Sequence, residues 1–173
     1  MRLFVDIRIP PALLPRIFDS CRMLEKSGAR LVVPANLHIT LKFIGKMPEE
    51  KLAEIEAALS AVRFAPFQVS LSGAGAFPTE KFPRAIWIGG KSEGADELAA
   101  KVEAALSFLH LKSEKFALHL TVARSNGDAK IGEFVRNTKE IGSFEVRSFF
   151  LTKSTLSKWG AAYEVVREFP AGD

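Results

Sequence analysis

Two stretches with the same alternating pattern constrain this chain more than any other feature. Residues 38–44 read His-Ile-Thr-Leu-Lys-Phe-Ile, and residues 118–124 read Leu-His-Leu-Thr-Val-Ala-Arg. Successive side chains of a β-strand point to opposite faces. Each stretch therefore predicts a strand with one apolar face, and with an imidazole and a hydroxyl together on the other.

A single His-x-Thr is a weak motif, because threonine is simply a good strand residue. For one copy, a surface histidine with no chemical role is the better interpretation. The chain has only three histidines, however, and two of them begin such a strand, one in each half. This repetition favours a shared site. His110 has no matching threonine, and we interpret it as structural.

The rest of the chain mixes strand and helix patterns, and several strand patterns follow one another directly. This order predicts an α+β fold with mostly antiparallel sheets rather than a doubly wound parallel sheet. We expect a single domain over residues 1–173, made of two loosely duplicated lobes. The expected strands are 2–9, 31–33, 38–45, 67–71, 85–89, 118–124, 143–151 and 162–169, and the expected helices are 11–26, 48–62, 95–109 and a short one capped by Asp128.

Residues 72–78 contain Gly-x-Gly and are predicted to form a loop. Such glycines can bring backbone amides close to a phosphate. The segment lacks the third glycine and the strand–turn–helix setting of a dinucleotide-binding loop. We therefore interpret it as turn chemistry.

Composition excludes some classes of site and location. The net charge of +4 is compatible with a phosphate-bearing ligand. Cys21 is the only cysteine, so no internal disulfide or cysteine-based zinc site can form, and we expect a buried thiol. We see no signal peptide and no apolar run long enough to span a membrane. The expected location is the cytoplasm, with no metal and no cofactor.

The paired motifs suit acid–base chemistry on a phosphodiester. Two imidazoles facing each other can donate and accept protons at neutral pH, because an unperturbed histidine titrates near ~6.5. The hydroxyls of Thr40 and Thr121 can donate to phosphoryl oxygens. Water could then open a cyclic phosphate in line without a metal. The residues alone do not say whether His38 or His119 is the acid.

The chain resembles the 2H phosphoesterase superfamily, and within it the RNA 2′,3′-cyclic phosphodiesterase (2′-5′ RNA ligase-like) family. The resemblance runs nearly end to end. Leu118 stands where the family usually has proline, and an aromatic residue usual near Leu31 is missing. The similar segments are 2–5, 36–45, 75–78, 83–89, 119–124 and 160–163.

The resemblance implies a LigT-like fold, in which two helix-backed lobes form a V-shaped cleft with the motifs facing across it. It implies that His38 is the proton donor and His119 the proton acceptor, and that Thr40 and Thr121 bind the phosphate. Arg124 matches the arginine of the second family motif and is expected to contact phosphate. Strict alternation would place Arg124 on the core face, so we expect the strand to end or bend there.

Two further residues are candidate substrate contacts. Lys42 shares the predicted face of His38, but we favour a position on the rim over a substrate contact. Phe43 is a candidate base-stacking platform, but its position in the alternation favours core packing.

By resemblance, the substrate is RNA with a 2′,3′-cyclic phosphate end, tRNA fragments being one candidate, and the product is a 2′-phosphomonoester. We expect a monomer that does not bind membranes. The alternatives are 2′-5′ ligation of RNA halves and an RNA-end binding module without turnover. Both histidines and both threonines are intact, which argues against the module, because binding alone needs cations and aromatics rather than an acid–base pair.

Overall fold

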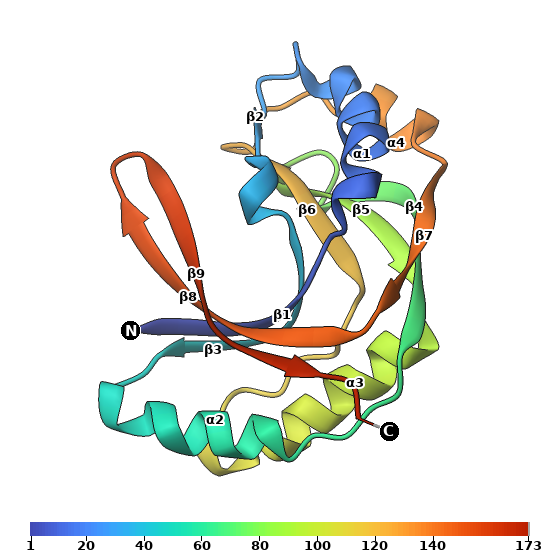
Figure 1. The fold of residues 1–173 in the computed structure, drawn as a ribbon. Coiled ribbons are helices and arrows are strands. Elements are labelled where there is room, and N and C mark those ends of the chain that lie inside the picture. Colours follow the sequence, from blue (N-terminus) through green and yellow to red (C-terminus); the bar gives the residue numbers. More distant parts are fainter. Residues whose placement is uncertain (173) are drawn as a thin grey trace.

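The fold is described by a computed structural model that covers residues 1–172. Its strands form two sheets in which every pairing is antiparallel (Figure 1). The predicted α+β, mostly antiparallel class is therefore confirmed. The first sheet has the order β3 (His38–Lys46), β1 (Arg2–Arg8), β8 (Ser148–Ser157), β9 (Gly160–Pro170), and the second has the order β2 (Arg30–Leu31), β6 (His119–Arg124), β5 (Pro83–Lys91), β4 (Phe67–Pro78), β7 (Glu140–Val146).

Four α-helices lie at the two ends of the molecule. Figure 1 shows α1 (Leu14–Cys21) and α4 (Gly132–Asn137) at one end, and α2 (Leu52–Ser60) and α3 (Glu93–Ala105) at the other. Helix α3 contacts β3 and β4, whereas α1 contacts β7. The Cys21 thiol of α1 is fully buried, as predicted. Within residues 1–172, no helix is long and apolar enough to cross a membrane.

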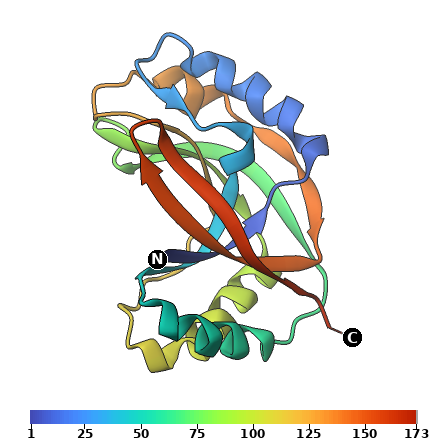
Figure 2. The same cartoon turned by 60° about the vertical axis from the view of Figure 1, so that its left-hand side comes forward.

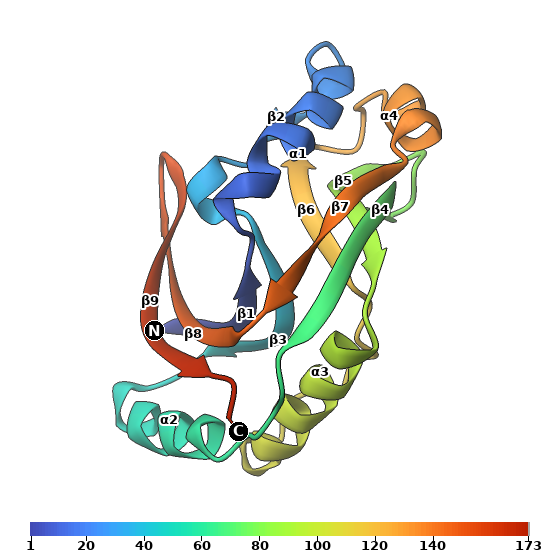
Figure 3. The same cartoon turned by 45° about the vertical axis from the view of Figure 1, so that its right-hand side comes forward.

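The chain passes from the second sheet to the first at Arg147. Strand β7 pairs with β4, and β8 pairs with β1 (Figure 3). The single strand predicted over 143–151 is therefore wrong. The alternation changes phase at Arg147, since Phe144 and Val146 are buried before it and Phe149 and Leu151 after it. The C-terminal hairpin, β8 and β9, thus completes a sheet begun by β1, and Figure 2 shows it extending beyond its neighbours.

The Gly-x-Gly segment is not a turn, because β4 continues through it to Pro78. The pairing of β4 with β5 shifts between Leu71 and Ala74, and Gly73 there has a φ of 72°. The glycine accommodates a bulge within a strand. Gly75 leaves room for the Trp87 ring. A Cβ atom at this position would lie only 2.5 Å from that ring.

Two smaller predictions also fail. Asp128 does not cap α4, whose N-cap is Ile131 without a side-chain hydrogen bond. The short strand predicted at 31–33 is Arg30–Leu31, one residue earlier, although Val32 N–H still donates to the Val122 carbonyl of β6 at 2.8 Å.

Each motif strand carries one extra residue directly after its threonine. In β3, Thr40 pairs with Asp6 and Lys42 with Val5, so Leu41 has no partner on β1. In β6, Thr121 pairs with Trp87 and Ala123 with Ile86, so Val122 has no partner on β5. A bulge of this kind reverses the alternation beyond it.

The two bulges decide where three predicted site residues lie. Arg124 is exposed and returns to the face of His119, which confirms that the strand bends there. The core packing favoured for Phe43 is wrong, because Phe43 is 63% exposed and returns to the face of His38. Lys42 is turned off that face and buried, so the predicted shared face is wrong too. Its Nζ lies 2.6 Å from Glu103 Oε2 and donates to the Lys112 carbonyl at 2.8 Å.

We predict that Lys42→Met lowers the free energy of unfolding by about 1–3 kcal/mol, because it leaves the Glu103 carboxylate and the Lys112 carbonyl without the ammonium that they bind. Urea unfolding measures the change. Glu103→Gln is the matched variant for a double-mutant cycle. The two changes should together cost less than the sum of the single ones, whereas additive costs would contradict the pairing.

Candidate active site

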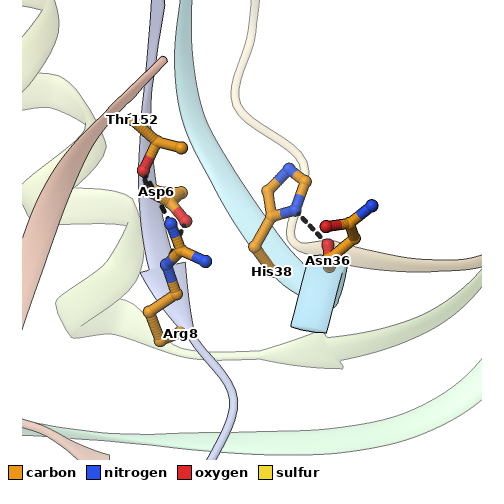
Figure 4. Close-up of polar contacts among 5 residues, drawn as sticks. All are labelled: Asp6, Arg8, Asn36, His38 and Thr152. Atoms are coloured by element: carbon orange, nitrogen blue, oxygen red, sulfur yellow. Dashed lines mark hydrogen bonds and ion pairs between the residues drawn. The ribbon is translucent and has the colours of Figure 1, made fainter. Parts of the chain in front are cut away.

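The two motif histidines are anchored in the same way. His38 Nδ1 lies 2.7 Å from the Asn36 carbonyl oxygen, and His119 Nδ1 lies 2.7 Å from the Ala117 carbonyl oxygen. A carbonyl only accepts, so Nδ1 must carry the proton in each ring. Figure 4 shows the second ring nitrogen of His38 directed away from Asn36. Both Nε2 atoms are thereby left available for chemistry.

Each imidazole is flanked by two aromatic rings. The centroid of His38 lies 4.8 Å from that of Phe4 and 5.2 Å from that of Tyr163. The centroid of His119 lies 5.0 Å from that of Phe77 and 6.5 Å from that of Trp87. The aromatics come from β1 and β9 in one sheet and from β4 and β5 in the other. They limit the movement of both rings.

The two motifs meet at the junction of the sheets, where β3 contacts β6. Thr40 and Thr121 are half-buried, on the same faces as the histidines. A pocket of about 290 Å³ is lined by Thr40 and Phe43 from β3, by His119 from β6, and by Lys112 and Lys115 from the segment between α3 and β6. Thr40 of the first motif and His119 of the second therefore line one pocket, whereas His38, Thr121 and Arg124 are not among its lining residues. His110 is exposed, lies in this same segment between α3 and β6, and belongs to neither motif strand.

Positive charge converges on His38. Burial lowers the pKa of His38 to about 4, and the nearby charges of Arg8, Arg124 and His119 act in the same direction. The hydrogen bond to Asn36 opposes them but does not outweigh burial. His38 is therefore neutral at pH 7 when the site is empty. The same cluster of cations favours an anion in the site.

A buried acidic group lies behind this cluster. Asp6 is fully buried; its Oδ1 accepts a hydrogen bond from Thr152 Oγ1 at 2.7 Å, and its Oδ2 lies 2.9 Å from Arg8 Nε (Figure 4). Burial raises the pKa of Asp6 to about 6, against the opposing effects of Arg8 and Thr152. The carboxyl group thus faces the interior, with the guanidinium over it.

Sequence reasoning missed the residues that surround the motif rings. The first strand was interpreted only as a strand, although its even positions Phe4, Asp6 and Arg8 alternate with apolar Val5 and Ile7. That pattern could have indicated a functional face. Nothing in the sequence pairs β1 with β8, so Thr152 could not have been found. The aromatic neighbours Phe77, Trp87 and Tyr163 lie in segments that resemble the family, but their contacts with the motif rings depend on the tertiary structure.

Comparison with known proteins identifies the family. An Archaeoglobus fulgidus protein named RNA 2′,3′-cyclic phosphodiesterase is 41% identical, over 98% of this chain and 99% of its own. The profile described as LigT-like phosphoesterase matches residues 7–87. The chain belongs to the LigT-like phosphoesterase family. A Methanocaldococcus jannaschii relative with the same name as the Archaeoglobus protein is 34% identical, over 98% of this chain and 100% of its own.

The LigT-like phosphoesterase fold is also found in solved structures. A crystal structure of a Thermus thermophilus protein has a TM-score of 0.86 and 30% identity, and the match covers 98% of this chain and 97% of that one. Escherichia coli LigT complexed with 3′-AMP has a TM-score of 0.85 at 21% identity, covering 99% of this chain and 98% of that one. The latter similarity concerns the fold alone.

No group of three or more His, Cys, Asp or Glu side chains within residues 1–172 is arranged to hold a metal ion. The two motifs of this LigT-like phosphoesterase carry imidazoles, hydroxyls and a guanidinium group at the junction of the two sheets. These groups can transfer protons and bind an anion.

We predict that His38 titrates near pH 4, well below the ordinary histidine, because its ring is buried among cations. Side-chain ¹⁵N NMR, assigned with His38→Gln, measures the midpoint. Inorganic phosphate should raise it, because a bound anion stabilises the imidazolium. A midpoint near the ordinary ~6.5 that is insensitive to phosphate would contradict this environment.

The same pKa shift links folding to pH. Unfolded histidine takes up its proton near ~6.5, so His38 should destabilise the fold as pH falls from there to about 4. Asp6 has the opposite sign, because its raised pKa stabilises the fold as pH falls below about 6. The pH-dependent contributions of His38 and Asp6 to stability should therefore partly cancel in wild type. His38→Gln should remove the contribution of His38.

Proposed function

We propose that this chain is an RNA 2′,3′-cyclic phosphodiesterase that hydrolyses the cyclic phosphate at an RNA end to a 2′-phosphomonoester. The observation that carries the proposal is the matched pair of imidazoles, each with Nδ1 held by a carbonyl and Nε2 left available. Relatives with this name, up to 41% identical across nearly the whole chain, support it. A turnover assay on 2′,3′-cyclic AMP and on RNA with a cyclic phosphate end tests it.

The reaction needs one proton removed and one supplied. His119 Nε2 takes a proton from water as the water oxygen attacks phosphorus. The bond from phosphorus to O3′ breaks in line, and His38 Nε2–H protonates the leaving O3′. The phosphate remains on O2′, and the two rings exchange their protonation states. The carbonyls of Asn36 and Ala117 keep Nδ1 protonated throughout, so that only Nε2 reacts.

His38 must gain its proton together with the substrate. In the empty site its lowered pKa keeps the ring neutral. A phosphodiester anion beside His38 offsets the charges of Arg8 and Arg124, so substrate binding raises the pKa of His38. The acid is thereby prepared only when there is a leaving group to protonate.

The remaining contacts hold the substrate. The hydroxyls of Thr40 and Thr121 donate to phosphoryl oxygens, and Arg124 adds a charged donor from the face of His119. The exposed ring of Phe43, beside the same pocket, provides a face for the terminal base. Lys42 is left out, because its ammonium is bound to Glu103 and Lys112. We extend the proposal to a monomer that acts in the cytoplasm on RNA ends such as those of tRNA fragments.

Replacing Thr40 or Thr121 by valine should slow turnover about ten- to a hundredfold and leave the fold intact, because each change removes one hydrogen bond to a charged group. Steady-state kinetics with 2′,3′-cyclic AMP measures the loss, and circular dichroism checks folding. Thr155→Val, in the sheet of Thr40 but near the tip of the β8–β9 hairpin, is the matched control. Wild-type rates in both motif variants would remove the threonines from the site.

Each change of a motif histidine to alanine should reduce the rate about 10²–10⁴-fold, and the double variant should lose less than the product. A substrate with an activated leaving group needs no acid, so it should restore His38→Ala but not His119→Ala. Restoration of His119→Ala instead would reverse the two roles.

EDTA should leave the rate unchanged, since the described residues form no three-ligand metal cluster. Full activity of either single alanine variant, or loss of activity on chelation, would contradict the two-histidine mechanism.

A further inference from the structure

Arg8 lies beside His38 in the first sheet. The two residues are direct partners in the antiparallel pairing of β1 with β3. Paired residues point their side chains to the same face of a sheet. Figure 4 shows the Arg8 guanidinium and the His38 ring side by side on their neighbouring strands. Arg8 therefore belongs to the face that carries the first motif.

Two buried groups hold the Arg8 guanidinium on one side. Its Nη2 donates to Thr152 Oγ1 at 2.8 Å, and its Nε lies 2.9 Å from Asp6 Oδ2. Asp6 and Thr152 are both fully buried, and the Phe150 ring centroid lies 5.7 Å from the guanidinium carbon. A guanidinium held in this way loses little conformational freedom when it binds a ligand.

The third nitrogen of the guanidinium remains available. Within residues 1–172, no acceptor forms a hydrogen bond with Nη1. The side chain is 26% exposed, whereas that of its partner Asp6 is not exposed at all. A ligand at this face therefore meets the cation and not the carboxylate behind it.

We infer that Arg8 is a phosphate-binding residue, which donates from Nη1 to the phosphate that lies between the two motif histidines. The inference rests on the proposed function for the identity of the ligand. Arg8 and Arg124 would then approach the same anion from different sheets, β1 and β6. The charges of Arg8 and Arg124 both act on His38, which is consistent with the two guanidinium groups lying near the same anion.

A purely structural ion pair is the competing interpretation of Arg8. It predicts that loss of the arginine affects stability but not phosphate binding. The two interpretations are separated by measuring the binding of inorganic phosphate, which requires no turnover and so stands apart from the test of the proposed function.

The experiment compares Arg8→Gln and Arg8→Lys with Arg167→Gln, by ³¹P NMR titration with inorganic phosphate. Arg167 is the matched control, because it lies in the same sheet near an aromatic ring, Phe169, but pairs with the buried Leu151 of the opposite face. We expect Arg8→Gln to weaken phosphate binding about ten- to a hundredfold, Arg8→Lys to restore part of it, and Arg167→Gln to change it less than twofold.

Two further measurements keep the inference testable if Arg8→Gln folds poorly. In wild type, phosphate should shift the Nε–H resonance of Arg8. Thr152→Val keeps the arginine but removes one anchor, and should weaken phosphate binding by a smaller factor. An unshifted Arg8 resonance, or equal binding by Arg8→Gln and Arg167→Gln, would overturn the inference.

Substrate length identifies which phosphate is bound. For 2′,3′-cyclic AMP and a dinucleotide with the same end, Arg8→Gln should lower kcat/KM by the same factor, because the reacting phosphate is common to both. A loss confined to the dinucleotide would assign Arg8 to the upstream phosphate and overturn this placement.

Discussion

The extra residue after each motif threonine is the constraint on which the rest of the site depends. Without it, Phe43 and Arg124 would point into the core, and Lys42 would stand beside His38. With it, each strand presents three groups to one face: His38, Thr40 and Phe43 from β3, and His119, Thr121 and Arg124 from β6. The two strands thus follow one backbone plan but differ in their third side chain, aromatic in one and cationic in the other.

Sequence alone was sufficient for the local features. Alternation around His38 and His119 placed both motifs on strands, with the histidine and threonine sharing a face. It failed where one strand departs from strict alternation, because a bulge is decided by pairing with a neighbour and not by the residue itself. The same limit explains the missed sheet change at Arg147 and the strand that passes through Gly73. Contacts between β1 and β8, and hence the surroundings of Arg8, depend on residues more than a hundred positions apart.

Burial and charge act together at His38. Phe4 and Tyr163 pack against the imidazole and the charges of Arg8 and Arg124 lie near it, and both effects disfavour a proton on the ring. An anion reverses the second effect and leaves the first. The site therefore couples the charge of the ligand to the protonation of His38. The apolar rings of Phe4 and Tyr163 strengthen that coupling, because charges interact more strongly where water is excluded.

The pairing of the first strand with the C-terminal hairpin has a consequence for the order in which the protein becomes functional. Arg8 and His38 are synthesised before Thr152 and Tyr163, which contact them and lie more than a hundred positions later in the chain. β1 lacks its second neighbour until then. This face of the first sheet is therefore complete only after the hairpin has been synthesised, and a chain that stops short of β8 would hold Arg8 and His38 without these contacts.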